Sequence, residues 1–148
     1  MSGIRAITTE SASSAATERL GGELAATLRP GDVVLIEGEL GAGKTTFVRG
    51  AARALGVRDP ITSPTFTIGQ LYATEDGPVA EVAHLDLYRL GSLADEDPGL
   101  LADYLRPDTI AFVEWPQGAE FELAAQARRS RWVRLSHLGG DRRAVELR

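Results

Sequence analysis

The sequence predicts an α/β fold in which residues 1–148 form one domain, with a mixed, mostly parallel sheet flanked by helices. Three observations lead to this prediction. A chain of 148 residues has the size of one domain and can bury a single stable core. Its 43% apolar and 25% charged residues are typical of a globular protein. In the first half, apolar runs of strand length alternate with helical segments, which favours parallel strands covered on both faces.

The first half of the chain predicts two strands and two helices. Leu20, Leu24 and Leu28 recur at helical spacing, and Pro30 follows them as a helix breaker. The continuous apolar run DVVLIE is typical of a buried central strand. Gly56 is expected to lie just past the end of the second helix. The expected elements are a strand over 3–8, a helix over 14–28, a strand over 32–37 and a helix over 44–55.

The second half predicts further strands, several of them in hairpins that make the sheet mixed. Turn residues at 74–78 and again at 139–140 separate pairs of strand-like runs. Residues 91–105 are helical in part, but Pro98 and Gly99 interrupt the pattern. The expected elements are a surface loop over 57–64 and strands over 65–73, 79–86, 109–113, 131–138 and 143–147.

The composition excludes several kinds of function. The chain has no cysteine, which excludes disulfides, thiolate nucleophiles and cysteine-held metal centres. Its formal charge of −5 disfavours direct binding of nucleic acid over a broad face. No apolar run approaches the roughly 18 residues that a membrane span needs, and the first twenty residues lack the apolar core of a secretion signal. We therefore expect a cytoplasmic protein with no membrane partner.

Residues 38–45 (GELGAGKT) match the phosphate-loop pattern G-x-x-x-x-G-K-[ST] at every position. The motif follows the predicted buried strand and opens a predicted helix, which is the context it needs. Glycines let backbone amides turn toward phosphate oxygens, and the helix N-terminus adds positive partial charge. Lys44 is expected to reach the β- and γ-phosphates and Thr45 to bind Mg²⁺. The alternative, a glycine-rich turn with an incidental lysine, is less consistent with motif, strand and helix coinciding. The fold prediction thus becomes a P-loop NTPase-like domain.

The use of lysine narrows the choice of nucleotide. The 16 basic residues are fifteen arginines and one lysine, which is Lys44. Guanine-specific P-loop proteins read the base with an [NT]-K-x-D segment, and a chain whose only lysine lies in the phosphate loop cannot contain one. ATP is therefore the expected nucleotide.

Two acidic residues are candidates for the carboxylate that P-loop enzymes place near Mg²⁺. Glu114 follows the apolar run Ile110–Val113, and Asp86 follows a less uniform run. Both lie where ligands bind in open α/β sheets, at the carboxyl ends of strands. The alternative for each is a solvated acid at a strand end. The sequence does not decide which of them positions an attacking water.

Other residues near these motifs allow two interpretations each. Thr65, or Thr62, follows the phosphate-loop helix where switch threonines sense a γ-phosphate, although Ser63-Pro64 also fits a plain turn. His84 is interpreted as a hydrogen-bonded structural histidine. Trp115 is expected to pack against the nucleotide, a partner or the core. The arginines at 128, 129, 131 and 134 suggest a solvated strand edge or a surface for phosphate or a partner.

Four segments together resemble the bacterial TsaE (YjeE) family in order and spacing, and the resemblance covers essentially the whole chain. The segments are GELGAGKTTFVRG (38–50), TSPTFT (62–67), HLDLYRL (84–90) and EWP (114–116). The resemblance implies a P-loop ATPase required for the N6-threonylcarbamoyladenosine modification of tRNA. It implies ATP and Mg²⁺ as cofactors and the TsaD–TsaB heterodimer as partner, with tRNA reached indirectly through that partner. Family members are not thought to transfer the threonylcarbamoyl group themselves.

The resemblance also implies a role for each residue of the motifs. Thr45 and Glu114 correspond to the magnesium ligands, Thr65 to the switch threonine and Asp86 to an essential aspartate. The candidate catalytic residues are Lys44, Thr65, Asp86 and Glu114. The residues expected to bind the nucleotide are Glu39, Leu40, Gly41, Ala42, Gly43, Lys44, Thr45 and Thr46.

Two other classes of function remain open from the residues alone. A small-molecule P-loop kinase would transfer the γ-phosphate to a hydroxyl group, but it normally needs a lid or acceptor subdomain, for which residues 56–113 leave little room. A nucleotide-binding module without turnover would use Asp86 and Glu114 for structure only. Loss of function on replacing either acid distinguishes an ATPase from such a module.

Overall fold

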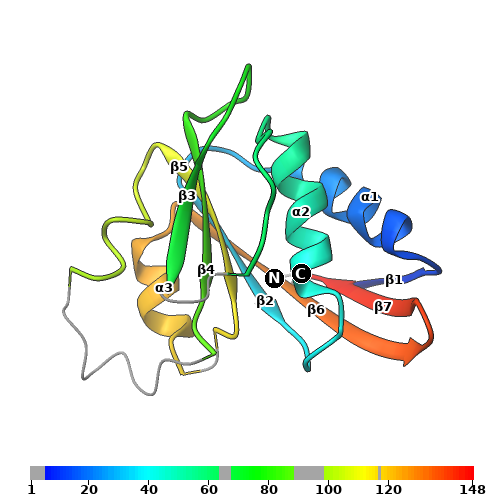
Figure 1. The fold of residues 1–148 in the computed structure, drawn as a ribbon. Helices are drawn as coiled ribbons and strands as arrows, with labels where there is room; N and C mark the ends of the chain where they lie inside the picture. Colours follow the sequence, from blue (N-terminus) through cyan, green and yellow to red (C-terminus); the bar gives the residue numbers. More distant parts are fainter. Residues whose placement is uncertain (1–5, 64–67, 89–98, 117) are drawn as a thin grey trace.

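The chain forms a seven-stranded mixed sheet with helices on both faces (Figure 1). This computed structural model describes residues 6–63, 68–88, 99–116 and 118–148. Figure 1 shows α1 and α2 on one face of the sheet and α3 on the other. The described elements are β1 (Ile7–Ser11), α1 (Ser14–Ala25), β2 (Asp32–Glu37), α2 (Lys44–Ala54), β3 (Gly69–Ala73), β4 (Glu81–Asp86), β5 (Thr109–Glu114), α3 (Glu120–Gln126), β6 (Arg129–Gly139) and β7 (Arg142–Leu147).

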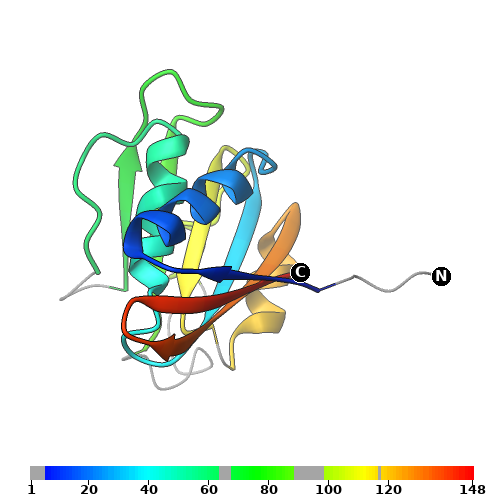
Figure 2. The same cartoon turned by 90° about the vertical axis from the view of Figure 1, so that its right-hand side faces the viewer.

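The sheet has a parallel centre and antiparallel edges. Its strand order is β1-β7-β6-β2-β5-β4-β3, and the central strands β6, β2, β5 and β4 are parallel. β3 pairs antiparallel with β4 at one edge. At the other edge β7 and β1 add antiparallel pairs, and Figure 2 shows β1 lying beside β7. The carboxyl ends of β2, β5 and β4 consequently meet at one edge, since Glu114 is in register with both Ile36 and Asp86.

Two apolar cores hold the three layers together. One core lies between the sheet and the α1–α2 pair, and it includes Phe47 of α2 and Phe112 of β5. The other lies on the α3 side and includes Leu123 of α3. α1 and α2 approach closely at two glycines: a Cβ at Gly21 or Gly50 would overlap a carbonyl oxygen of the other helix. This contact fixes α2, whose N-terminus faces the carboxyl ends of the strands.

Most of the predicted elements are confirmed, with shifted ends. β2 has its predicted bounds, α2 and β5 differ by one residue, and Gly56 follows α2 with a φ of +99°. β1 is described from Ile7 to Ser11 and extends past the predicted end at residue 8, because Thr9 to Ser11 pair with β7; residues 3–5 of the predicted strand lie outside the described residues. α1 ends at Ala25 rather than 28, and Leu28 instead closes a turn onto the Ala25 carbonyl.

The remaining differences lie in the second half of the chain. The short helix α3 was not predicted, because only Leu123 of its seven residues is buried and so shows no helical period. The predicted partial helix over 91–105 falls mostly outside the described residues, and residues 99–105 form turns. The predicted strand over 65–73 is described from Gly69 onward. Within the described residues, no helix combines the length and apolarity needed to span a membrane.

Candidate functional site

The phosphate-loop motif connects the end of β2 to the start of α2. Gly41 and Gly43 have φ angles of +77° and +94°, a conformation that favours glycine because other residues have a Cβ there. Gly43 is the N-cap of α2, and no side chain caps this end of the helix. The first amides of a helix have no partner within it. The loop and helix end therefore form an anion-binding cradle in the expected place.

Lys44 is nearly buried and points back over the loop. Its side chain is 5% exposed, and its ammonium donates to the carbonyl oxygens of Gly38 and Glu39 at 2.6 and 2.8 Å. The same nitrogen lies 4.2 Å from the ring centroid of Trp115. Burial lowers the pKa of Lys44, and the negative charges of Glu114, Asp86 and Glu39 oppose that shift. The loop's own carbonyls and an aromatic ring hold the ammonium.

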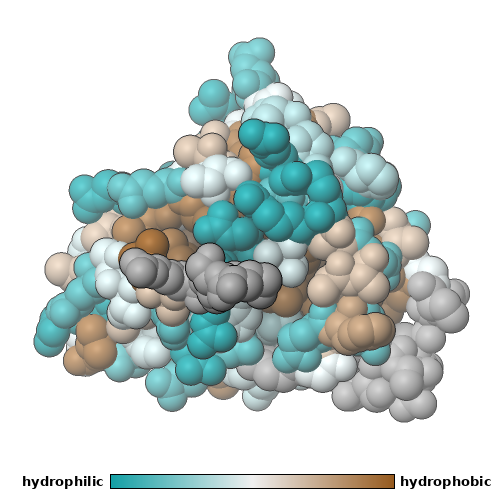
Figure 3. Space-filling view, turned by 180° about the vertical axis from the view of Figure 1, so that it is seen from behind, coloured by the Kyte–Doolittle hydropathy of each residue, from teal (hydrophilic) through white to brown (hydrophobic). Residues whose placement is uncertain are grey.

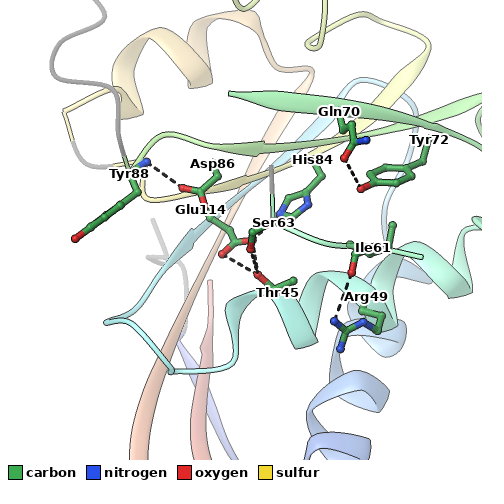
Figure 4. A network of polar contacts seen from close by, with 10 residues as sticks. All are labelled: Thr45, Arg49, Ile61, Ser63, Gln70, Tyr72, His84, Asp86, Tyr88 and Glu114. Carbon is green, nitrogen blue, oxygen red and sulfur yellow. Dashed lines mark hydrogen bonds and ion pairs between the residues drawn. The ribbon is translucent and has the colours of Figure 1, made fainter. Parts of the chain in front are cut away.

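Glu114 of β5 contacts side chains of two other elements, α2 and β4, as Figure 4 shows. Its carboxylate is 3% exposed and accepts from the Thr45 hydroxyl at 3.0 Å to Oε2 and 3.3 Å to Oε1. The same hydroxyl is 3.0 Å from that of Ser63. On its other side, Oε2 lies 2.5 Å from Nε2 of His84. Strand β5, helix α2 and strand β4 thus converge on one carboxylate.

Asp86 lies beside Glu114 at the end of β4 and is the second acid of the site. Its Oδ1 accepts from the backbone amide of Tyr88 at 3.0 Å. Burial raises the pKa of the Asp86 carboxyl and the negative charge of Glu114 raises it further, whereas the Tyr88 amide, His84 and Lys44 lower it. Asp86 therefore holds a proton more strongly than an ordinary aspartate.

These residues surround a cavity of about 330 Å³. Arg143 of β7 completes its wall next to the loop, where Nη2 donates to the Gly41 carbonyl at 3.0 Å. Positive groups from α2 and β7 thus face the two carboxylates across the cavity. The lining residues are Leu40, Gly41, Gly43, Lys44, Thr45, Thr46, Ser63, Asp86, Glu114, Trp115 and Arg143.

The groups present fit a magnesium–nucleotide complex. The loop cradle suits phosphate oxygens, and the hydroxyl of Thr45 and the carboxylate of Glu114 are the hard oxygen ligands that Mg²⁺ prefers. Mg²⁺ usually takes one or two carboxylates together with substrate phosphates rather than a cage made only of protein. The donor set therefore matches a cation that is shared with bound phosphates.

The structure brings most of the predicted site residues together. Eight of them line the cavity, as the lining residues named above show. Glu39 contributes its carbonyl oxygen to Lys44, and the Ala42 side chain is fully buried in the core. The predicted switch residue Thr65 lies outside the described residues.

Sequence reasoning assigned no role at this site to Ser63 or Arg143, and it gave His84 a structural role only. The position of His84 could have been anticipated, because it lies two residues before Asp86 and so shares a face of β4 with it. No local signal marks Arg143. The pairing of β7 with β6, and of β6 with β2, brings it to the loop.

Comparisons with known proteins agree on one family. The profile described as "Threonylcarbamoyl adenosine biosynthesis protein TsaE" matches residues 11–144. Two relatives named tRNA threonylcarbamoyladenosine biosynthesis protein TsaE are similar over 82% of this chain: the Streptomyces coelicolor protein is 45% identical over 80% of its own length, and the Bacillus subtilis protein is 39% identical over 72%. A crystal structure of Bacillus subtilis YdiB superposes with a TM-score of 0.73 and 29% identity, covering 99% of this chain and 87% of that one.

Proposed function

Because the chain belongs to the TsaE family, which is involved in tRNA threonylcarbamoyladenosine biosynthesis, we propose that it binds and hydrolyses ATP in that pathway. The observation that carries this proposal is the contact between Thr45 and Glu114 at the mouth of the phosphate loop. It joins the residue that opens α2 to an acid at the end of a central parallel strand. P-loop enzymes hold Mg²⁺ with such a pair.

Each group of the site then has a part in phosphate chemistry. The amides at the start of α2 bind the phosphates, and the ammonium of Lys44, which lies over the loop, contacts them. Thr45 and Glu114 would hold Mg²⁺, which when bound would act as a Lewis acid toward the phosphates. Asp86 orients the attacking water. Phosphoryl transfer needs mainly positioning and charge stabilisation, so a chain that acts with a partner is expected to turn over slowly alone.

We propose that the partner is the TsaD–TsaB heterodimer and that ATP binding and hydrolysis dock this chain on it and reset the complex. Two exposed apolar side chains near the cavity support a partner there: Leu40 of the loop is 70% exposed and Tyr88, whose ring lies tilted against that of Trp115, is 54% exposed. In this proposal the partner transfers the threonylcarbamoyl group and binds tRNA. In this proposal the chain acts in the cytoplasm.

The test is phosphate release from Mg-ATP by the purified chain, alone and with TsaD–TsaB from the same cell. We expect weak release alone and a strong increase with the heterodimer. Lys44→Ala should reduce the stimulated rate by about 100-fold or more, because it removes a charge aimed at the phosphates. Arg53→Ala, which removes an exposed charge from the other end of α2, is the matched control and should leave the rate unchanged.

Two outcomes contradict the proposal. If Lys44→Ala releases phosphate as fast as the wild-type protein, the loop is not the catalytic site. If ATP is consumed only when a small hydroxyl compound is added, and the heterodimer has no effect, the chain is a kinase.

A further inference from the structure

His84 is the most deeply buried polar side chain near the site, and the mechanism above does not use it. Its ring is 0% exposed. Nε2 contacts Glu114 at 2.5 Å, whereas Nδ1 is buried without a hydrogen-bond partner among the described residues. Buried polar atoms are normally paired. A histidine that served only the packing of the core would be expected to satisfy both nitrogens or to be replaced by an apolar residue.

The register of β4 with β5 brings the His84 ring next to Glu114. In the pairing of β4 with β5, His84 is level with Phe112 and Asp86 is level with Glu114. Side chains two residues apart on a strand share a face, so His84 and Asp86 both lie on the α2 side of the sheet. Figure 4 shows the Glu114 carboxylate between the His84 ring and the Thr45 hydroxyl.

The chemistry of the contact makes the histidine a donor. An ionised carboxylate can only accept hydrogen bonds, and Glu114 already accepts from Thr45. The ring therefore donates from Nε2 to Oε2, and its Nδ1 is buried. The donors holding Glu114 are a hydroxyl and an imidazole, neither of which need carry a formal positive charge. The negative charge of the carboxylate thus remains available to a cation.

We propose that His84 is a positioning residue that orients Glu114 toward Thr45, so that the two present their oxygens to the Mg²⁺ bound with the nucleotide. This inference rests on the proposed function and adds one residue to it. Hydrogen-bond partners of metal-ligating carboxylates are worth about 10–100-fold in metal affinity or activity. His84 then affects the metal-dependent part of nucleotide binding and leaves the contacts of the loop with the phosphates unchanged.

The experiment measures that metal-dependent part directly. The probe is a fluorescent, non-hydrolysable ATP analogue, methylanthraniloyl AMPPNP, titrated with the full chain in EDTA and again in saturating MgCl₂. The ratio of the two Kd values gives the tightening due to Mg²⁺. In His84→Phe, which keeps a ring but no donor, we expect this ratio to fall about 10-fold or more, while the Kd in EDTA stays within about 2-fold of the wild-type value.

Three further variants separate positioning from damage to the fold. His84→Gln keeps a donor and should restore part of the Mg²⁺ tightening. Val82→Ala trims a buried residue two positions earlier on the same face of β4 and should leave the ratio unchanged. In the Glu114→Gln background, His84→Phe should cause no further loss, because a residue that acts through Glu114 has nothing left to orient. The variant that combines Glu114→Gln with His84→Phe also removes the buried charge of Glu114. It can therefore test the role of His84 if His84→Phe alone does not fold.

Several outcomes overturn the inference. They are an unchanged ratio in His84→Phe, an equal weakening in EDTA and in MgCl₂, and a further loss from His84→Phe in the Glu114→Gln background. If the wild-type chain does not bind the analogue at all, the proposed function fails first. If the wild-type chain binds it with Mg²⁺ tightening and His84→Phe does the same, only the role of His84 is wrong.

Discussion

Two buried carboxylates lie at opposite ends of the central strands, and they are held in different ways. Asp32 opens β2 and is 0% exposed, and Glu114 ends β5 and is 3% exposed. Asp32 forms ion pairs with Arg128 and Arg129 at 2.7 and 3.1 Å. It also accepts the backbone amide of Arg29 at 2.9 Å. Glu114 has the Thr45 hydroxyl and the His84 ring instead, while the ammonium of Lys44 is bonded to loop carbonyls.

The difference separates a structural charge from one suited to function. Two guanidinium groups pair with Asp32, so its negative charge is not left available to a cation. Arg128 and Arg129 are two of the four arginines that the sequence places at 128, 129, 131 and 134. A third member, Arg134, pairs with Glu37. At Glu114 the printed partners are a hydroxyl and an imidazole ring rather than guanidinium groups. A buried carboxylate held mainly by hydrogen-bond donors can exchange one of them for a metal ion.

Replacing Glu114 or Asp32 by its amide should give the largest effects, on activity in the first case and on stability in the second. We expect Glu114→Gln to lower Mg-ATP hydrolysis about 100- to 1000-fold, with stability within about 1 kcal/mol of wild type. Asp32→Asn should lose about 1–3 kcal/mol of stability, because its ion pairs with two guanidinium groups are lost, while its folded fraction keeps normal activity. Urea denaturation and steady-state phosphate release measure the two effects. A stable, active Asp32→Asn or an active Glu114→Gln would refute the distinction.

The ion pairs of Asp32 can also be tested by replacing its partners, Arg128 and Arg129. Arg128→Ala or Arg129→Ala alone leaves one guanidinium and should have a small effect. The double variant leaves a buried charge without a cationic partner and should lose about 3 kcal/mol. The double-mutant cycle is therefore expected to be strongly non-additive. Additive single losses, read from urea midpoints at constant m-value, would show that Asp32 is better solvated than its burial indicates.

The sequence was sufficient for the parts of the site that are contiguous or lie at strand ends. The phosphate loop is one continuous motif, and Glu114 and Asp86 each follow an apolar run. The contact of Arg143 with the loop depends instead on the position of β6 between β2 and β7, which no local pattern records. The partner of His84 likewise follows from strand register. At the site, long-range pairing rather than local propensity decided what sequence analysis missed.

Asp86 differs from both other acids and gives the smallest expected effect. Its pKa is raised from 3.8, mainly by burial, so the folded state binds the proton more tightly than the unfolded state. Its ionisation therefore lowers stability as the pH rises from the unfolded pKa through the raised folded pKa. Asp86→Asn cannot ionise and keeps an oxygen for the Tyr88 amide. It should gain stability over the wild-type protein across that window and keep the gain at higher pH.

This gain should be accompanied by a loss of activity. A carboxylate that binds protons more strongly is a better base near neutral pH, which suits the role proposed for Asp86 of orienting the attacking water. Urea midpoints of both proteins from pH 3 to 8, paired with phosphate release at pH 8, measure the two effects. A stability difference that is the same at every pH would contradict the raised pKa. A more stable Asp86→Asn with full activity would instead leave Glu114 as the acid that contacts the water.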